Sequence, residues 1–115
     1  MGGPKKLYSN QKHISFQNKP RNKNNPYNSY SRSALKAAMC NLSNSALRLY
    51  LYLGNYRDMP EGIYLSKQDA LNSTNISEKS YFSALKELKE KGYLIQDDIW
   101  DSEDYYVFYE DPIPM

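Results

Sequence analysis

Three serines divide the middle of the chain into helical segments, and this succession restricts the fold more than any other feature. Ser43, Ser66 and Ser77 each stand directly before a stretch with apolar residues at helical spacing. A serine in that position accepts a hydrogen bond from a backbone N–H of the first helical turn, which otherwise lacks a partner. The predicted helices cover residues 44–55, 67–71 and 78–91. Gly92 follows the last of them, where a helix often ends in a left-handed residue.

A short helix precedes these three. It is expected to begin at Ser31 or Ser33 and to use Leu35, Ala38 and Met39 as its apolar positions. The helix that follows Ser43 is apolar on more than one side, which predicts the central helix of the core. Tyr50 and Tyr52 on that broad apolar surface are also candidates for a contact in a homodimer, which the sequence leaves open.

Strand-forming residues flank the last two helices. Ile63–Leu65 predicts a brief strand, and residues 93–96 and 105–109 predict a β-hairpin with an acidic tip. The expected fold class is therefore α+β, mostly α, with one domain over residues 31–111 and a tail at 112–115.

The charges of the chain are unevenly distributed. The net charge is +2, but residues 1–36 carry eight basic residues and no acid, whereas the remainder has a net charge of −6. Residues 1–30 are also rich in Asn, Gln, Ser and Pro, so they are expected to form a flexible basic arm, with a short strand around Lys12–Gln17 left open. Such an arm attracts polyanions, because each phosphate contact releases condensed counterions.

The composition argues against several classes of protein. Cys40 is the only cysteine and His13 the only histidine, so the sequence offers no disulfide, no zinc-ligand spacing and no convincing nucleophile–base pair. Cys40 is interpreted as a small buried hydrophobic residue. There is no glycine-rich phosphate loop. We therefore expect no enzymatic activity, no cofactor and no metal. Without a long apolar run, no contact with a membrane is expected, and the predicted location is the cytoplasm of a bacterial host cell.

The order of helices, strand and hairpin resembles that of winged helix-turn-helix domains. The stretch Ile76–Ile95 looks like a recognition helix that continues through Lys91-Gly92-Tyr93-Leu94 into the first strand of the wing. Leu42–Leu53 is similar to the core helix of small winged helix proteins from phages and plasmids of Gram-positive bacteria, among them regulators and replication-initiator domains. In members of this superfamily that bind DNA, the last helix enters the major groove.

The resemblance implies where double-stranded DNA would be contacted. On the last helix and its approach, the implied contacts are Asn75, Ser77, Lys79, Ser80, Ser83 and Lys86. Further expected contacts are Lys67 and, in or beside the arm, Lys19, Arg21, Lys23 and Arg32. The packing side of the last helix is expected to hold Tyr81, Phe82, Leu85 and Leu88.

Two features depart from the winged helix pattern. The turn from Leu71 to Ile76 is longer than usual, and Asn75 is expected to take the place of a left-handed glycine. The hairpin region 97–111 holds seven acids and no Lys or Arg, so phosphates would repel it. It is expected to fold back on the basic arm, to face a basic protein partner, or only to keep the domain soluble.

Two functions follow from these observations. The first is a DNA-binding regulator or replication accessory protein. The alternative is a protein-binding module, such as a phage-encoded inhibitor of a host protein, that uses Asp98, Trp100 and Asp101 of the acidic hairpin.

Overall fold

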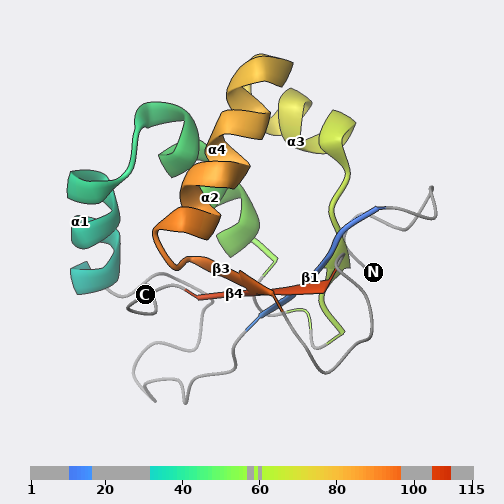
Figure 1. Cartoon of the computed structure of the whole chain (residues 1–115), viewed down its shortest axis with the longest axis horizontal. Coiled ribbons are helices and arrows are strands. Elements are labelled where there is room, and N and C mark those ends of the chain that lie inside the picture. Colours follow the sequence, from blue (N-terminus) through green and yellow to red (C-terminus); the bar gives the residue numbers. More distant parts are fainter. Residues whose placement is uncertain (1–10, 17–31, 57–58, 60, 97–104, 110–115) are drawn as a thin grey trace.

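The described part of the protein places its helices on one side of a small sheet (Figure 1). The computed structural model describes residues 11–16, 32–56, 59, 61–96 and 105–109. The helices are α1 (Arg32–Asn41), α2 (Asn44–Gly54), α3 (Lys67–Thr74) and α4 (Glu78–Glu90). The strands are β1 (His13–Phe16), β2 (Ile63–Tyr64), β3 (Leu94–Gln96) and β4 (Tyr105–Phe108), and their order in the sheet is β2-β1-β4-β3. The predicted α+β fold class is confirmed.

The three serine caps are present as the sequence predicted. The side chains of Ser43, Ser66 and Ser77 each accept from the backbone N–H three residues further on, at the starts of α2, α3 and α4. The helix starts are therefore fixed by local hydrogen bonds, independently of the core.

Helix α2 runs through the centre of the core, as its broad apolar surface predicted. Its Leu49, Tyr50 and Leu53 are fully buried. The Tyr50 ring meets the Tyr93 ring edge-on at 5.3 Å between centroids. The suggestion that Tyr50 and Tyr52 make a dimer contact is wrong, because both side chains lie inside the domain and Tyr52 is only 4% exposed.

Strand β1 lies in the middle of the sheet. It pairs antiparallel with β2 and parallel with β4, with His13 opposite both Tyr64 and Tyr105. Ile14 and Phe16 on its other face are buried in the core. The strand that the sequence left open within the arm is therefore present, and the fold begins well before residue 31. The rest of the arm, residues 1–10 and 17–30, lies outside the described residues.

The close approach of the α2–β2 connection to β1 requires a glycine. Gly62 has φ +75°, and a Cβ there would lie 2.3 Å from the carbonyl oxygen of Ile14. Only glycine combines this backbone conformation with so short a separation.

The C-terminal hairpin is confirmed by the antiparallel pairing of β3 with β4, which sets Leu94 opposite Phe108. The expected tip, residues 97–104, lies outside the described residues, as does the tail.

Two interpretations of α1 are wrong. Met39 is 62% exposed, and Cys40 is exposed rather than buried. The buried side of α1 consists of Ala34 and Ala38, which are four residues apart and so lie on the same face. In the described part of the chain, no helix is long and apolar enough to cross a membrane.

Candidate nucleic-acid interface

The turn between α3 and α4 is short and contains one left-handed residue. Helix α3 continues to Thr74, so the expected long turn from Leu71 is wrong. Two hydrogen bonds accompany the extra turn of helix: Thr74 Oγ1 donates to Ala70 O at 2.6 Å, and Arg48 Nη1 donates to Thr74 O at 2.8 Å. Asn75 then adopts φ 57° and ψ 41°, which confirms that it takes the place of a left-handed glycine.

Helix α4 presents a polar face to solvent. Lys79, Ser83 and Lys86 are exposed on this face, which we call the outer face of α4. The described strands of the β3–β4 hairpin lie at the C-terminal end of α4 (Figure 1). The structure therefore leaves three of the expected contact residues accessible on one helix.

The other expected contacts near the start of α4 are also accessible in part. Asn75 and Ser77 are exposed and Ser80 is half-buried. The hydroxyl of Ser77 accepts from Ser80 N at 3.1 Å and donates to Ser80 Oγ at 3.0 Å. These bonds hold the two hydroxyls together at the helix start.

One residue on the packing side was assigned wrongly. Tyr81, Leu85 and Leu88 are buried as expected, but Phe82 is 53% exposed. Successive helical residues are about 100° apart, so the residue after buried Tyr81 turns away from the core toward the outer face. The sequence signal was ambiguous because the two aromatic residues are adjacent.

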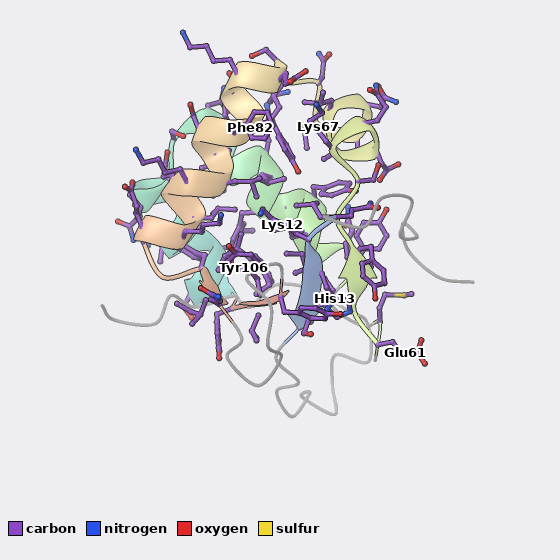
Figure 2. All side chains as sticks on the ribbon, turned by 45° about the vertical axis from the view of Figure 1, so that its right-hand side comes forward. Lys12, His13, Glu61, Lys67, Phe82 and Tyr106 are labelled. Carbon is purple, nitrogen blue, oxygen red and sulfur yellow. The ribbon has the colours of Figure 1, made fainter. Side chains whose placement is uncertain are left out.

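Lys67 connects the two helices of the helix-turn-helix. Its Nζ lies 3.2 Å from Glu78 Oε2 and 5.6 Å from the centroid of the Phe82 ring. Figure 2 shows Lys67 and Phe82 side by side at the α3–α4 border. The expected contact Lys67 is thus close to the outer face of α4 and partly neutralised by Glu78.

Two lysines contact a tyrosine of the sheet. Lys12 Nζ and Lys89 Nζ lie 5.6 and 4.8 Å from the centroid of the same Tyr106 ring. Both distances are within the range of a cation–π contact. The sequence does not indicate this pair, because β1 and β4 are distant in the chain and only their pairing brings Lys12 to Tyr106.

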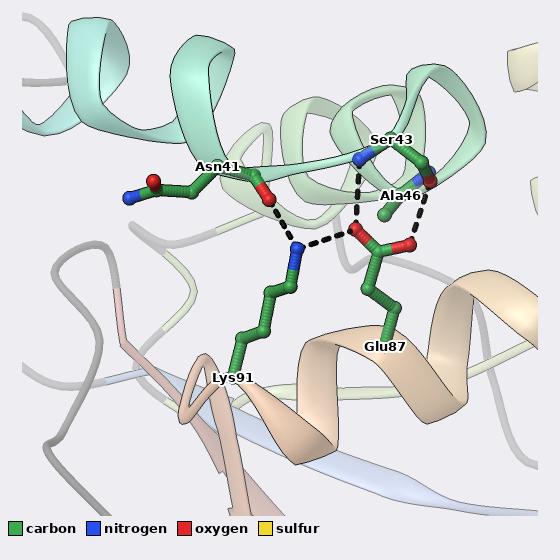
Figure 3. A network of polar contacts seen from close by, with 5 residues as sticks. All are labelled: Asn41, Ser43, Ala46, Glu87 and Lys91. Carbon is green, nitrogen blue, oxygen red and sulfur yellow. Dashed lines mark hydrogen bonds and ion pairs between the residues drawn. The ribbon is translucent and has the colours of Figure 1, made fainter.

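A polar network fixes α4 against the α1–α2 turn (Figure 3). The Glu87 carboxylate accepts from Ser43 N and from Ser43 Oγ, both at 2.7 Å. Lys91 Nζ lies 3.3 Å from Glu87 Oε2 and donates to the carbonyl oxygen of Asn41. Burial alone would raise the pKa of Glu87, but the bonds from Ser43 and the charge of Lys91 outweigh it and lower the pKa.

A hydrogen bond between α2 and α3 holds the other side of the site. Tyr52 Oη donates to Asp69 Oδ2 at 2.5 Å. Burial, and then the neighbouring Asp69 carboxylate, raise the pKa of Tyr52, so its hydroxyl stays protonated and remains a donor. Both helices of the helix-turn-helix are therefore tied to α2, which gives the outer face of α4 a fixed orientation.

Several expected contacts cannot be placed. Lys19, Arg21 and Lys23 lie outside the described residues, as do Asp98, Trp100 and Asp101 of the acidic hairpin. Arg32 begins α1, but only its backbone is described.

The arrangement agrees with a known family. Residues 41–94 match the family model of a helix-turn-helix domain. This segment is similar to helix-turn-helix domains. The match runs from the last residue of α1 to the first residue of β3 and so includes both α3 and α4. Together with the β3–β4 hairpin, the domain has a winged helix-like α+β fold. No curated protein and no solved structure matches the chain.

Proposed function

We propose that this protein binds double-stranded DNA sequence-specifically and acts as a regulator or replication accessory protein of the kind encoded by phages and plasmids. In this proposal α4 of the helix-turn-helix domain lies in the major groove and the basic N-terminal segment adds phosphate contacts. The protein performs no catalysis of its own.

The observation that carries the proposal is the accessibility of the outer face of α4. A helix docks in the major groove only if its polar side is free, and Lys79, Ser83 and Lys86 are all exposed. An α-helix with its side chains is about 10–12 Å across and the major groove is about 12 Å wide, so α4, whose 13 residues span about 20 Å, can lie in it. Lysine can reach a guanine edge or a phosphate, and serine can donate to either.

The lysine pair at Tyr106 supports the same orientation. Lys89 belongs to α4, and both Lys89 and Lys12 contact the Tyr106 ring. Positive charge next to a docked helix favours the DNA backbone that borders the groove. The proposal therefore assigns these two lysines to phosphate contacts.

The test begins with selection of binding sites from a random duplex library, followed by affinity measurements over a range of salt concentrations. Lys79→Gln and Lys86→Gln should each weaken binding to the selected site. A lost phosphate contact should also reduce the log–log salt slope by about 0.9. Lys36→Gln is the matched control, because it removes the same charge from an exposed position on α1. Failure to recover any preferred site, or equal losses for all three variants, would contradict the proposal.

The basic N-terminal segment needs a test that spares β1. Replacing Lys19, Arg21 and Lys23 together by Gln retains Ile14 and Phe16 in the core, whereas deleting residues 1–30 would remove them. If all three residues contact phosphates, the salt slope should fall by up to about 2.7. An unchanged slope would remove this segment from the mechanism.

A further inference from the structure

Phe82 is an apolar side chain exposed on an otherwise polar helix face. Its ring is 53% exposed, and Lys79 and Lys86 lie three residues before it and four residues after it, also exposed. Residues at these spacings are neighbours on a helix surface. Phe82 is therefore only partly buried by the core, and the buried side of α4 is already formed by Tyr81, Leu85 and Leu88.

The ring is held in place by its surroundings. The Tyr81 ring meets it edge-on at 5.2 Å between centroids, and Lys67 Nζ lies 5.6 Å from its centroid (Figure 2). These contacts restrict the side chain, so docking orders it at a smaller entropic cost. Phe82 is the fifth residue of α4, about 6 Å along the helix from its start. It therefore belongs to the N-terminal half, which carries Lys79 and Ser83 and approaches the bases first.

We propose that Phe82 contacts the 5-methyl group of a thymine and makes that thymine a required base of the binding site. The inference rests on the proposed function, because it requires α4 to lie in the major groove. A phenyl ring neither donates nor accepts a conventional hydrogen bond, and the thymine methyl is the apolar group that the major groove exposes. Lys79 and Lys86 on the same surface supply contacts to guanine edges or phosphates, so the ring occupies the apolar position between two polar ones.

The experiment removes the methyl group without changing base pairing. In the site selected from the random library, each thymine is replaced in turn by deoxyuridine, and the affinity of the full chain is measured at one salt concentration. The wild-type protein should lose about fourfold in affinity at one or two thymines, as expected for one buried methyl group. Phe82→Ala should bind the thymine and deoxyuridine duplexes equally, whereas Phe82→Leu should retain a preference for thymine.

Met39→Ala is the matched control. Met39 is also an exposed apolar side chain, but it lies on α1, so its removal should preserve the full thymine preference. Thermal unfolding of Phe82→Ala should stay close to that of the wild type, because about half of Phe82 is exposed and Tyr81, Leu85 and Leu88 form the buried side of α4.

Each outcome has a separate meaning. If the thymine preference is the same in wild type and Phe82→Ala, or absent in both while a duplex site is still recognised, this inference is wrong and the proposed function stands. If Phe82→Ala weakens all duplexes without regard to the methyl group, the ring contacts sugar or unstacks a base step, and the inference is also wrong. If no duplex is recognised at all, the proposed function fails and this inference fails with it.

Discussion

At the scale of single residues, the ion pair between Lys67 and Glu78 controls the charge at the start of α4. The two atoms are 3.2 Å apart, and the side chains are 42% and 60% exposed. An exposed pair of this kind contributes little to folding, so its effect should be seen in DNA binding. Glu78 favours the helix through its position in the first turn, but its charge would repel a phosphate nearby.

Removing either partner of this pair should therefore change DNA affinity in opposite directions. Glu78→Gln should strengthen binding severalfold at low salt and steepen the log–log salt slope by about 0.9, because Lys67 becomes available to a phosphate. Lys67→Gln should weaken binding, because it leaves the charge of Glu78 unpaired near the phosphates, and it should leave the slope nearly unchanged, because the paired lysine makes no phosphate contact in the wild type. The free energy of unfolding should change by no more than about 0.5 kcal/mol in either variant.

Glu90→Gln is the control for this prediction, since it removes the same charge from an exposed position at the other end of α4. An equal gain in affinity from Glu90→Gln would show that only the net charge matters and that the Lys67–Glu78 ion pair has no specific effect on DNA affinity.

At the scale of elements, the angle between α3 and α4 depends on one residue with positive φ. Asn75→Ala should lower the free energy of unfolding by about 1 kcal/mol, because a Cβ without a local hydrogen-bonding group disfavours the left-handed region. Asn75→Gly should leave stability close to wild type, since glycine adopts this conformation readily. Thermal or chemical denaturation gives both values.

Asn75→Gly also separates the role of Asn75 in the turn from a contact of its side chain with DNA. If Asn75 contacts DNA, Asn75→Gly should bind more weakly at unchanged stability. Equal stabilities for the alanine and glycine variants would contradict the assigned role of the turn.

The helix-turn-helix could be predicted to the extent that its signals are local. The starts of α2, α3 and α4 follow from Ser43, Ser66 and Ser77, whose bonds reach only three residues along the chain. The end of α3 could not be predicted in this way, because Thr74 is held by Arg48 from another helix. In isolation the polar residues before Asn75 indicate a turn, and only the tertiary contact decides between turn and helix.

The attachment of α4 to the α1–α2 turn makes the domain sensitive to acid. The pKa of Glu87 is lower in the folded protein than its ordinary value of 4.5, so its contribution to stability is present above that value and is lost as the pH falls through the lowered pKa. Glu87→Gln should cost about 1 kcal/mol at neutral pH, because hydrogen bonds to a charged group are replaced by neutral ones. It should cost less at pH 3, because the stabilisation by the charged carboxylate is lost as the pH falls below 4.5 and through the lowered pKa.

Denaturation of both proteins at pH 7 and pH 3 checks this difference. Glu90→Gln, on the exposed side of the same helix, should show no comparable dependence on pH. A stability difference between wild type and Glu87→Gln that is the same at both pH values would contradict the role assigned to the network.

At the scale of the whole molecule, the N-terminal segment both carries positive charge and supplies strand β1 of the sheet. The sequence did not separate these two roles. Its charge predicted an arm. The pairing partners of β1 are 49 or more residues away in the chain, so no local pattern predicts the pairing. The lysine pair around Tyr106 was missed for the same reason. In contrast, the β3–β4 hairpin was predictable, because its two strands are close in sequence.

The position of β1 predicts a sharp difference between two truncations. Deletion of residues 1–10 retains β1 together with Gln11 and Lys12, which bond to Leu65, and should leave a folded domain. Deletion of residues 1–16 removes the middle strand together with Ile14 and Phe16, and a domain with a total stability of about 5–15 kcal/mol should not survive that loss.

Ile14→Ala in the full chain tests the same packing more gently and should cost about 2–4 kcal/mol. Circular dichroism during thermal unfolding distinguishes these cases, and a cooperative transition at the wild-type temperature for residues 17–115 would show that the sheet closes without β1. The expected result makes the basic segment inseparable from the fold, because residues 1–10 and 17–31 lie in the sequence on either side of a core strand.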